Sequence, residues 1–322
     1  MAAVDTFEVL RPGILTTVQD LGRTGFARYG VAPSGALDGF ALRVANLLAG
    51  NPEDAAALET AVVGLRLKAL QDVVVAITGA NLKPMRGGEP LAMWRSHRIR
   101  AGEVIAFSGS AGGMHSYVAV SGGISVPPVL GSRSTNLTSG FGGVAGRALR
   151  KGDILCRAVV ENEFRFAGRA FEPAWIPVYP SRWRLRVVWG PQDDQFTEEG
   201  RHAFVTGVFS VSPDSDRTGI RLKGPAVARR LDLPESIISE GVIAGAIQIP
   251  GDGQPIIILA ETTTGGYRKI ATVISADLPL LGRIMPGNEV AFNAVSLDEA
   301  VRALRESEEK IAEFKKRLAA LS

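Results

Sequence analysis

The segment between residues 245 and 269 carries the densest group of side chains that could bind a small polar molecule. Three consecutive threonines, residues 262–264, precede two glycines, and such a turn can present hydroxyls and backbone N–H groups to an anion. Lys269 adds a cation, Gln248 an amide and Tyr267 a phenol. The alternative is a β-hairpin turn flanked by β-branched strand residues. The candidates from this segment are Lys269 as a catalytic residue and, as substrate-binding residues, Gln248, Thr263, Thr264 and Tyr267.

A second polar group precedes and enters a helical segment near the N-terminus. The run TVQDLGR, residues 17–23, places an amide and two charges on glycine-broken backbone, and helix capping does not account for it. Asp38 is a candidate catalytic residue, although a carboxylate at this position also suits the N-cap of the following helix. Asn46 lies at i+8 from Asp38, so both can share a helix face that we expect to look towards a partner or the substrate. Asn46 is therefore a candidate substrate-binding residue.

A third cluster, residues 215–219, reads SDRTG. One interpretation is a turn held by a local ion pair between Asp216 and Arg217, which would contribute at most about 1 kcal/mol if exposed. The other is that Arg217 binds the substrate. Both interpretations remain open from the residues alone.

Composition and missing motifs exclude several function classes. The formal net charge is only +3 and the basic residues are scattered, so the basic surface that nucleic-acid binding requires is missing. The single cysteine, Cys156, cannot form an internal disulfide. The sequence has no HExxH pattern and no His/Cys cluster, so no metal site is predicted. No GxxxxGK[ST] loop is present, and the glycine-rich segment 140–146 is predicted to be a flexible loop instead of a dinucleotide site.

The cellular location of the protein is predicted from two kinds of segment that the sequence lacks. No apolar run approaches the roughly 18 residues of a membrane-spanning helix. The first residues, MAAVDTFEVLRPG, lack the charged-then-apolar layout of a signal peptide. We therefore expect no membrane partner and a cytoplasmic location.

Short apolar runs closed by glycine predict a mainly β protein. Clear strand patterns occur at residues 73–77, 104–107, 117–120, 183–189 and 256–259. Few helices are expected: one at residues 37–48, ending at a Gly-Asn-Pro signal, and a short one at residues 52–58. An irregular proline-containing stretch between residues 161 and 180 indicates a boundary between two domains. The predicted organisation is an N-terminal β-rich domain, 1–172, a C-terminal β-rich domain, 173–295, and a C-terminal helix, 296–322.

The C-terminal helix, about Ser296 to Leu321, is predicted by a capping box of Ser296 and Glu299 and by one apolar face. The opposite face is charged, so the helix must dock on another surface to be stable. We expect it to dock between protomers, with packing on its own chain as the alternative. The apolar face consists of Val301, Leu304, Ile311, Phe314, Leu318 and Leu321.

Seven ordered segments resemble the allophanate hydrolase subunit 2 family, to which the 5-oxoprolinase C subunit and half of the urea carboxylase carboxyltransferase domain belong. They are TVQDLGRTGFARYGVAPSGALD, AVSGGISVPPVLGSRSTN, GPQDDQF, SDRTGIRLKG, GAIQIPGDGQPIIILAE, TTGGYRKIATVISADLPLLG and PGNEVAF. The resemblance implies two cyclophilin-like β-barrel domains with a few short helices, to which this sequence adds the C-terminal amphipathic helix. It also implies a B-type (subunit 1) partner that shares the active cleft.

The resemblance implies three functions. The first is the C-type component of an ATP-dependent 5-oxoprolinase, which opens a small lactam to glutamate with A-type and B-type subunits and is inactive alone. The second is the carboxyltransferase component of a urea or amide carboxylase, which would need a separate biotin carrier. The third is a non-enzymatic antagonist of a kinase inhibitor. Thr263 and Arg268 stand where the family has glutamine and proline, so the substrate group that is recognised can differ.

Overall fold

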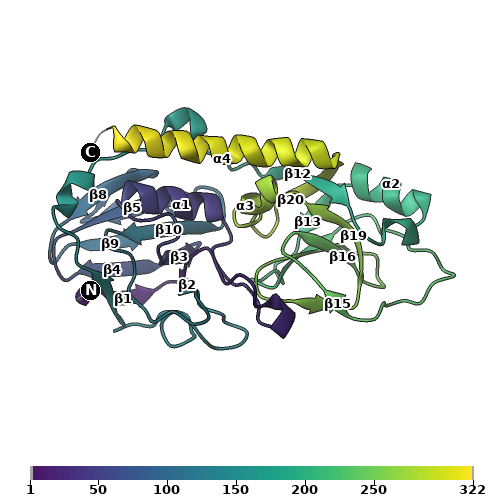
Figure 1. The fold of residues 1–322 in the computed structure, drawn as a ribbon, viewed down its shortest axis with the longest axis horizontal. Helices are drawn as coiled ribbons and strands as arrows, with labels where there is room; N and C mark the ends of the chain where they lie inside the picture. Colours follow the sequence, from purple (N-terminus) through teal and green to yellow (C-terminus); the bar gives the residue numbers. More distant parts are fainter. Residues whose placement is uncertain (1–2, 321–322) are drawn as a thin grey trace. The chain divides into compact units, whose positions relative to one another are not determined.

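The computed structural model describes residues 3–320, which form a mainly β protein with two compact units (Figure 1). Unit 1 holds the described residues up to Thr24, Ser34–Tyr179 and those from Ile311 onward; unit 2 holds Gly25–Pro33 and Pro180–Lys310. The change of unit after Tyr179 falls slightly beyond the boundary predicted at 172/173. The predicted third segment, 296–322, is not a unit of its own, because its residues are divided between the two.

The strands of unit 1 form two antiparallel sheets, with the orders β11-β1-β4-β9-β6-β7 and β2-β3-β10-β5-β8. The first sheet consists of β1 (Ala3–Pro12), β4 (Leu65–Ala69), β6 (Pro84–Arg86), β7 (Glu89–Pro90), β9 (Val104–Phe107) and β11 (Ile154–Ala158). The second consists of β2 (Leu15–Gln19), β3 (Ala57–Ala61), β5 (Val73–Gly79), β8 (Arg95–Ile99) and β10 (His115–Val120).

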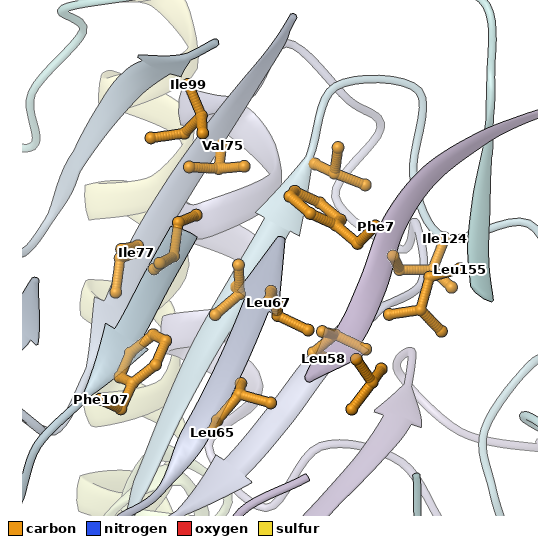
Figure 2. Close-up of a cluster of buried hydrophobic side chains, with 14 of the residues drawn as sticks. Phe7, Leu58, Leu65, Leu67, Val75, Ile77, Ile99, Phe107, Ile124 and Leu155 are labelled. Atoms are coloured by element: carbon orange, nitrogen blue, oxygen red, sulfur yellow. The ribbon is translucent and has the colours of Figure 1, made fainter. Parts of the chain in front are cut away.

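The main core of unit 1 is built from apolar residues of both sheets (Figure 2). Because successive side chains of a strand point to opposite faces, Val75 and Ile77 of β5 enter this core while Ala76 between them joins a second cluster. Both faces of β5 are therefore buried. This explains why its sequence, VVVAITG, is an apolar run without alternation.

Helix α1 (Gly39–Leu48) packs on the second cluster, together with Ala76 of β5 and Tyr117 of β10. It confirms the helix predicted at residues 37–48. Asp38 is its N-cap, and the Asp38 carboxylate accepts a hydrogen bond of 2.9 Å from the Ala41 N–H. The helix predicted at residues 52–58 is wrong: turns lead there into β3, where Leu58 pairs with Val18 and Val118 on its two sides. Pairing and burial of Leu58 outweigh a weak local helix pattern.

Unit 2 is a closed barrel with the strand order β12-β19-β16-β17-β14-β13-β20. Its strands are β12 (Arg182–Trp189), β13 (Phe209–Val211), β14 (Gly219–Lys223), β16 (Ala246–Ile249), β17 (Ile256–Ile258), β19 (Arg268–Val273) and β20 (Glu289–Ala294). A separate two-stranded ribbon joins β15 (Glu240–Gly241) to β18 (Thr264–Gly265). The prediction of a mainly β fold is confirmed; the closer likeness to cyclophilins stays a prediction.

The other helices are short except for the last. They are α2 (Glu198–Thr206), α3 (Leu278–Leu281) and α4 (Leu297–Ala319), with 3-10 turns at Ala27–Tyr29, Glu163–Phe166, Pro173–Trp175, Asp193–Gln195 and Ser275–Asp277. The sequence analysis missed α2, although Thr197 is its N-cap and accepts a hydrogen bond of 3.0 Å from the Gly200 N–H.

Helix α4, yellow in Figure 1, begins at the predicted capping box, where the Glu299 carboxylate accepts a hydrogen bond of 2.7 Å from the Ser296 N–H. Its residues Ile311, Phe314 and Leu318 are buried in the cluster of unit 1 that also contains α1. The expected docking between protomers is therefore wrong for this half of the helix, which packs on its own chain. Val301 and Leu304 stay more than a third exposed, and Leu321 lies outside the described residues.

Candidate functional site

A cleft of about 500 Å³ lies in unit 2, beside strands β14, β16, β17 and β18. Its apolar floor includes Leu222, Ile256 and Ile258, and its rim carries both acids and bases. An apolar cleft with a few polar groups is the usual form of a small-molecule site. The polar and charged side chains that line it are Ser212, Asp214, Thr218, Arg221, Lys223, Gln248, Asp252, Gln254, Thr262, Thr264 and Tyr267.

Gln248 lines this cleft and is only 4% exposed, while its role in substrate binding stays a prediction. Within residues 3–320, no group accepts a hydrogen bond from its side-chain Nε2, which is buried. A buried amide donor without an acceptor is costly, so such a group in a native cleft indicates a ligand or water that binds there. Gly265 lies against this amide, and a methyl group at that position would collide with it.

Lys269 stands opposite Gln248 in the antiparallel pair β16–β19, next to a bulge formed where Ile247 pairs with Ala271. Its ammonium is buried and forms an ion pair with Glu240 of the ribbon. The Glu240 carboxylate also accepts a hydrogen bond of 2.7 Å from the Gln192 amide. The bonds from Lys269 and then Gln192 hold the pKa of Glu240 below its usual value. Lys269 is therefore covered by an acid and is not among the residues that line the cleft.

The threonine–glycine segment forms part of the cleft through Thr264 and Tyr267, both exposed. Thr263 does not line it; its carbonyl accepts a hydrogen bond of 2.9 Å from the Val242 N–H. Arg217 is buried behind the cleft wall and donates a hydrogen bond of 2.9 Å to the Glu261 carboxylate.

Arg217 thus connects the two segments that place Thr218 and Thr262 on the cleft. Asp216 accepts hydrogen bonds from the Thr218 and Gly219 N–H groups at 2.7 and 3.1 Å, which stabilises the predicted turn.

Asp38 and Asn46 belong to unit 1, and both side chains are buried. The Asp38 carboxylate caps α1, which is the structural role considered for it. The Asn46 amide donates hydrogen bonds to the carbonyls of Glu53 and Ala55, at 3.1 and 2.7 Å, and accepts one from Asn51 at 3.2 Å. Neither residue lines the cleft of unit 2, so the structure gives both a role in holding α1 and the loop after it.

The Gln-Asp-x-Gly-Arg set also has a structural explanation. The buried Asp20 carboxylate accepts hydrogen bonds from the Gly22 and Arg133 N–H groups, at 2.8 and 2.5 Å, and from the Ser132 and Ser134 hydroxyls, at 2.6 and 2.5 Å. A carboxylate that satisfies four donors fixes the conformation of both loops that supply them.

The glycine-rich segment 140–146 does not have the form of a phosphate-binding loop. The N–H groups of Gly140, Gly143 and Gly146 donate to the carbonyls of Asn136, Arg133 and Gly142. Since a phosphate would need free N–H groups at this turn, the segment does not fit a nucleotide. Within residues 3–320, no three His, Cys, Asp or Glu side chains gather to hold a metal ion. In the same range, no helix combines the length and apolar character needed to cross a bilayer.

Sequence reasoning missed Glu240, Gln192, Arg221 and Lys223. Arg221 and Lys223 lie in the quoted segment SDRTGIRLKG, so the signal was available. Gln192 likewise lies in the quoted segment GPQDDQF, whereas Glu240 lies in none, and its contact with Lys269 depends on the fold of segments far apart in the chain.

Comparisons with known proteins agree with the quoted motifs. Residues 29–294 match the family model described as carboxyltransferase domain, subdomain A and B. The chain is 37% identical to the 5-oxoprolinase C subunit of Escherichia coli (strain K12) over 304 residues, which cover 94% of this chain and 95% of that protein. It is 33% identical to the urea amidolyase of Lachancea kluyveri, over 95% of this chain and 18% of that one.

A solved structure shares the whole fold. The crystal structure of Kluyveromyces lactis urea carboxylase is similar with a TM-score of 0.91 and 30% sequence identity, covering 98% of this chain and 29% of that one. The family model, the relatives and this structure all point to the same assignment, and the predicted resemblance is confirmed. The chain belongs to the family of the carboxyltransferase domain, subdomains A and B.

Proposed function

We propose that this chain is the C-type component of an ATP-dependent 5-oxoprolinase, which works with A-type and B-type subunits in the cytoplasm to convert 5-oxoproline to glutamate. The observation that carries the proposal is the amide of Gln248, a residue that lines the cleft and whose buried Nε2 has no acceptor among the described residues. A lactam carbonyl oxygen is a matching acceptor. Similarity over nearly the full length of a 5-oxoprolinase C subunit supports the same choice.

In this function, Gln248 orients the lactam by donating to its carbonyl oxygen. The reaction breaks the lactam C–N bond, adds the oxygen of water to the carbonyl carbon and transfers a proton to the departing nitrogen. A donor that is already placed near the carbonyl oxygen binds it more strongly as negative charge develops, which typically accelerates a step by about 10²–10³. Thr264 and Tyr267 supply hydroxyls at the rim of the same cleft.

ATP and the remaining catalytic groups are assigned to the complex as a whole. This chain has no phosphate-binding loop of the common type, and its glycine-rich segment has its N–H groups engaged internally. The isolated chain is therefore expected to be inert towards 5-oxoproline and ATP. Turnover by the chain alone, at the rate of the complex, would refute the sharing of the active site.

The test is to purify the chain with its A-type and B-type partners and to measure ATP-dependent formation of glutamate. Gln248→Met keeps the side-chain length and removes the donor, so kcat/KM is expected to fall by at least about 10². Gln71→Met, in unit 1, is the matched control and should keep full activity. Normal activity of Gln248→Met would exclude Gln248 from substrate binding.

A carboxyltransferase acting on urea or another amide is the second candidate, because the fold matches a urea carboxylase with a TM-score of 0.91. This function would require a separate biotin carrier. The same purified complex discriminates the two: transfer of a labelled carboxyl group from a carboxybiotin carrier to urea, without glutamate formation from 5-oxoproline, would favour the carboxyltransferase.

A further inference from the structure

Four residues of unit 2 form a closed ring of contacts next to the cleft. Gln248 stands opposite Lys269 on β16 and β19, and Lys269 forms an ion pair with Glu240. Glu240 in turn stands opposite Gly265 in the ribbon β15–β18, and Gly265 lies against the Gln248 amide. The unpaired amide and the covered lysine are therefore neighbours in one small site.

The two partners of the ion pair differ in their exposure. The Lys269 side chain is 8% exposed, whereas that of Glu240 is 44% exposed. The acid thus covers a buried cation from the solvent side. A buried cation must keep an anionic partner, because leaving it unpaired in a poorly solvated site is strongly unfavourable. A carboxylate that replaces Glu240 would satisfy this requirement, and a neutral molecule would not.

The element that carries Glu240 is small. Strands β15 and β18 contain two residues each, and an isolated ribbon of two short strands has little stability of its own. Gln192 holds the same carboxylate with a hydrogen bond of 2.7 Å, and its side chain is half-buried. Moving Glu240 away from Lys269 therefore does not require the barrel strands to separate.

We propose that Glu240 occupies the position on Lys269 that the carboxylate of the substrate takes on binding, and that this exchange makes the site select anionic lactams or amides over neutral ones. The proposal rests on the proposed function. It adds the carboxylate of the substrate as a second group that the site recognises. 5-Oxoproline carries both required groups: its lactam oxygen accepts from Gln248 and its carboxylate replaces Glu240 on Lys269. Urea has a carbonyl oxygen that can accept from Gln248 but no carboxylate that can replace Glu240.

The exchange is tested by calorimetric titration of the purified complex with 5-oxoproline and with 2-pyrrolidinone, the same lactam without the carboxylate. Glu240→Gln removes the competing charge, so the Kd of 5-oxoproline is expected to fall about tenfold, because a larger fraction of the sites is ready to bind. The Kd of 2-pyrrolidinone should not change. Equal effects on both compounds, or weaker binding of 5-oxoproline, would overturn the proposal.

Glu235→Gln is the matched control, since it removes the same charge from the same segment at an exposed residue that forms no ion pair within residues 3–320. It should leave both dissociation constants unchanged. Lys269→Met should remove the preference for 5-oxoproline over 2-pyrrolidinone. Circular dichroism of each variant confirms that the fold is retained.

A second readout follows the Glu240 carboxyl directly by carbon-13 NMR. Lys269 and Gln192 hold its pKa below the usual value of 4.5 in the free protein. Saturation with 5-oxoproline should return this pKa towards 4.5, because the ammonium is then bound to the substrate. A pKa that stays low at saturation would show that Glu240 is not displaced. Since neither test depends on turnover, a complex that fails to hydrolyse 5-oxoproline would contradict the proposed function alone.

Discussion

Arg217 and Glu261 form a buried ion pair behind the cleft of unit 2, with a hydrogen bond of 2.9 Å from Nε to the carboxylate. Removing one member takes a charged partner away from the other charge, which stays buried. We therefore expect Arg217→Met to lower the free energy of unfolding by about 3–5 kcal/mol.

The double variant Arg217→Met, Glu261→Met should recover part of this loss, because two apolar side chains can fill the same volume without a buried charge. Urea denaturation of the single and double variants measures both effects. A double variant that is less stable than either single one would contradict the interpretation of Arg217 as a mainly structural residue.

Phe314 connects α4 to unit 1 by packing edge-on against Phe171, with ring centroids 4.8 Å apart. Phe314→Ala should cost about 3–5 kcal/mol, as is usual for a buried aromatic residue. Val301→Ala is the control on the same helix and should cost less than about 1 kcal/mol, since Val301 is exposed. If thermal unfolding showed equal losses for both variants, the buried half of α4 would not be an anchor.

Asn46 should matter for stability and not for substrate affinity. Its amide makes two hydrogen bonds to backbone carbonyls and one to Asn51, all within unit 1. Asn46→Ala removes the buried donor of two hydrogen bonds to partly buried carbonyls, so we expect a loss of about 1–3 kcal/mol with an unchanged KM. Asn293→Ala, at an exposed position of β20, is the control. A raised KM without loss of stability would restore Asn46 as a substrate-binding residue.

Gly265→Ala tests the contact between the ribbon and the Gln248 amide. The added methyl group would collide with that amide, so the KM of the complex should rise at least about tenfold, a loss typical of a misplaced hydrogen-bond donor. Gly241→Ala changes the neighbouring strand of the same ribbon, where a methyl group meets no atom within 4 Å. That variant should be indistinguishable from the unmodified chain in KM and in kcat.

Asp153 gives a pH dependence whose sign follows from its partners. Two hydrogen bonds from the Arg147 guanidinium, of 2.8 and 2.9 Å, lower the pKa of Asp153 below the usual 3.8, and the Arg150 N–H assists. A lowered folded-state pKa contributes stability above the unfolded value, and this contribution is lost as the pH falls through the folded value.

The free energies of unfolding of the unmodified chain and of Asp153→Asn should therefore differ at pH 7, by about 1 kcal/mol for a partly exposed pair. The difference should shrink as the pH falls below 3.8. A difference that stays constant from pH 7 to pH 2 would mean that the charge of Asp153 is not responsible.

The elements that the sequence predicted correctly are those with strong local signals. The apolar run of β5, the Asp38 cap of α1 and the Ser296–Glu299 capping box each depend on residues close together in the chain. The helix predicted at residues 52–58 failed because Leu58 is placed by pairing with distant strands. Local propensity decides structure only where tertiary contacts do not oppose it.

Some residues of the candidate cleft could be selected from the sequence for the same reason. Gln248, Thr264 and Tyr267 lie in two adjacent motifs and do line the cleft. The covering of Lys269 by Glu240 could not be predicted, since it depends on a ribbon of two-residue strands that has no pattern of its own. Asp38 and Asn46 were selected by their spacing on one helix, and a shared face does not distinguish a polar core network from a binding surface.

The burial of Ile311, Phe314 and Leu318 in unit 1 has a consequence for synthesis on the ribosome. These residues follow residues 180–310 in the chain, yet they complete a core whose other members precede Tyr179. During translation, the apolar face of unit 1 that these three residues cover therefore stays exposed until residues 180–310 have been made. At about 5–20 residues per second, this exposure lasts roughly 7 to 26 seconds, a period in which a chaperone could bind the exposed apolar surface.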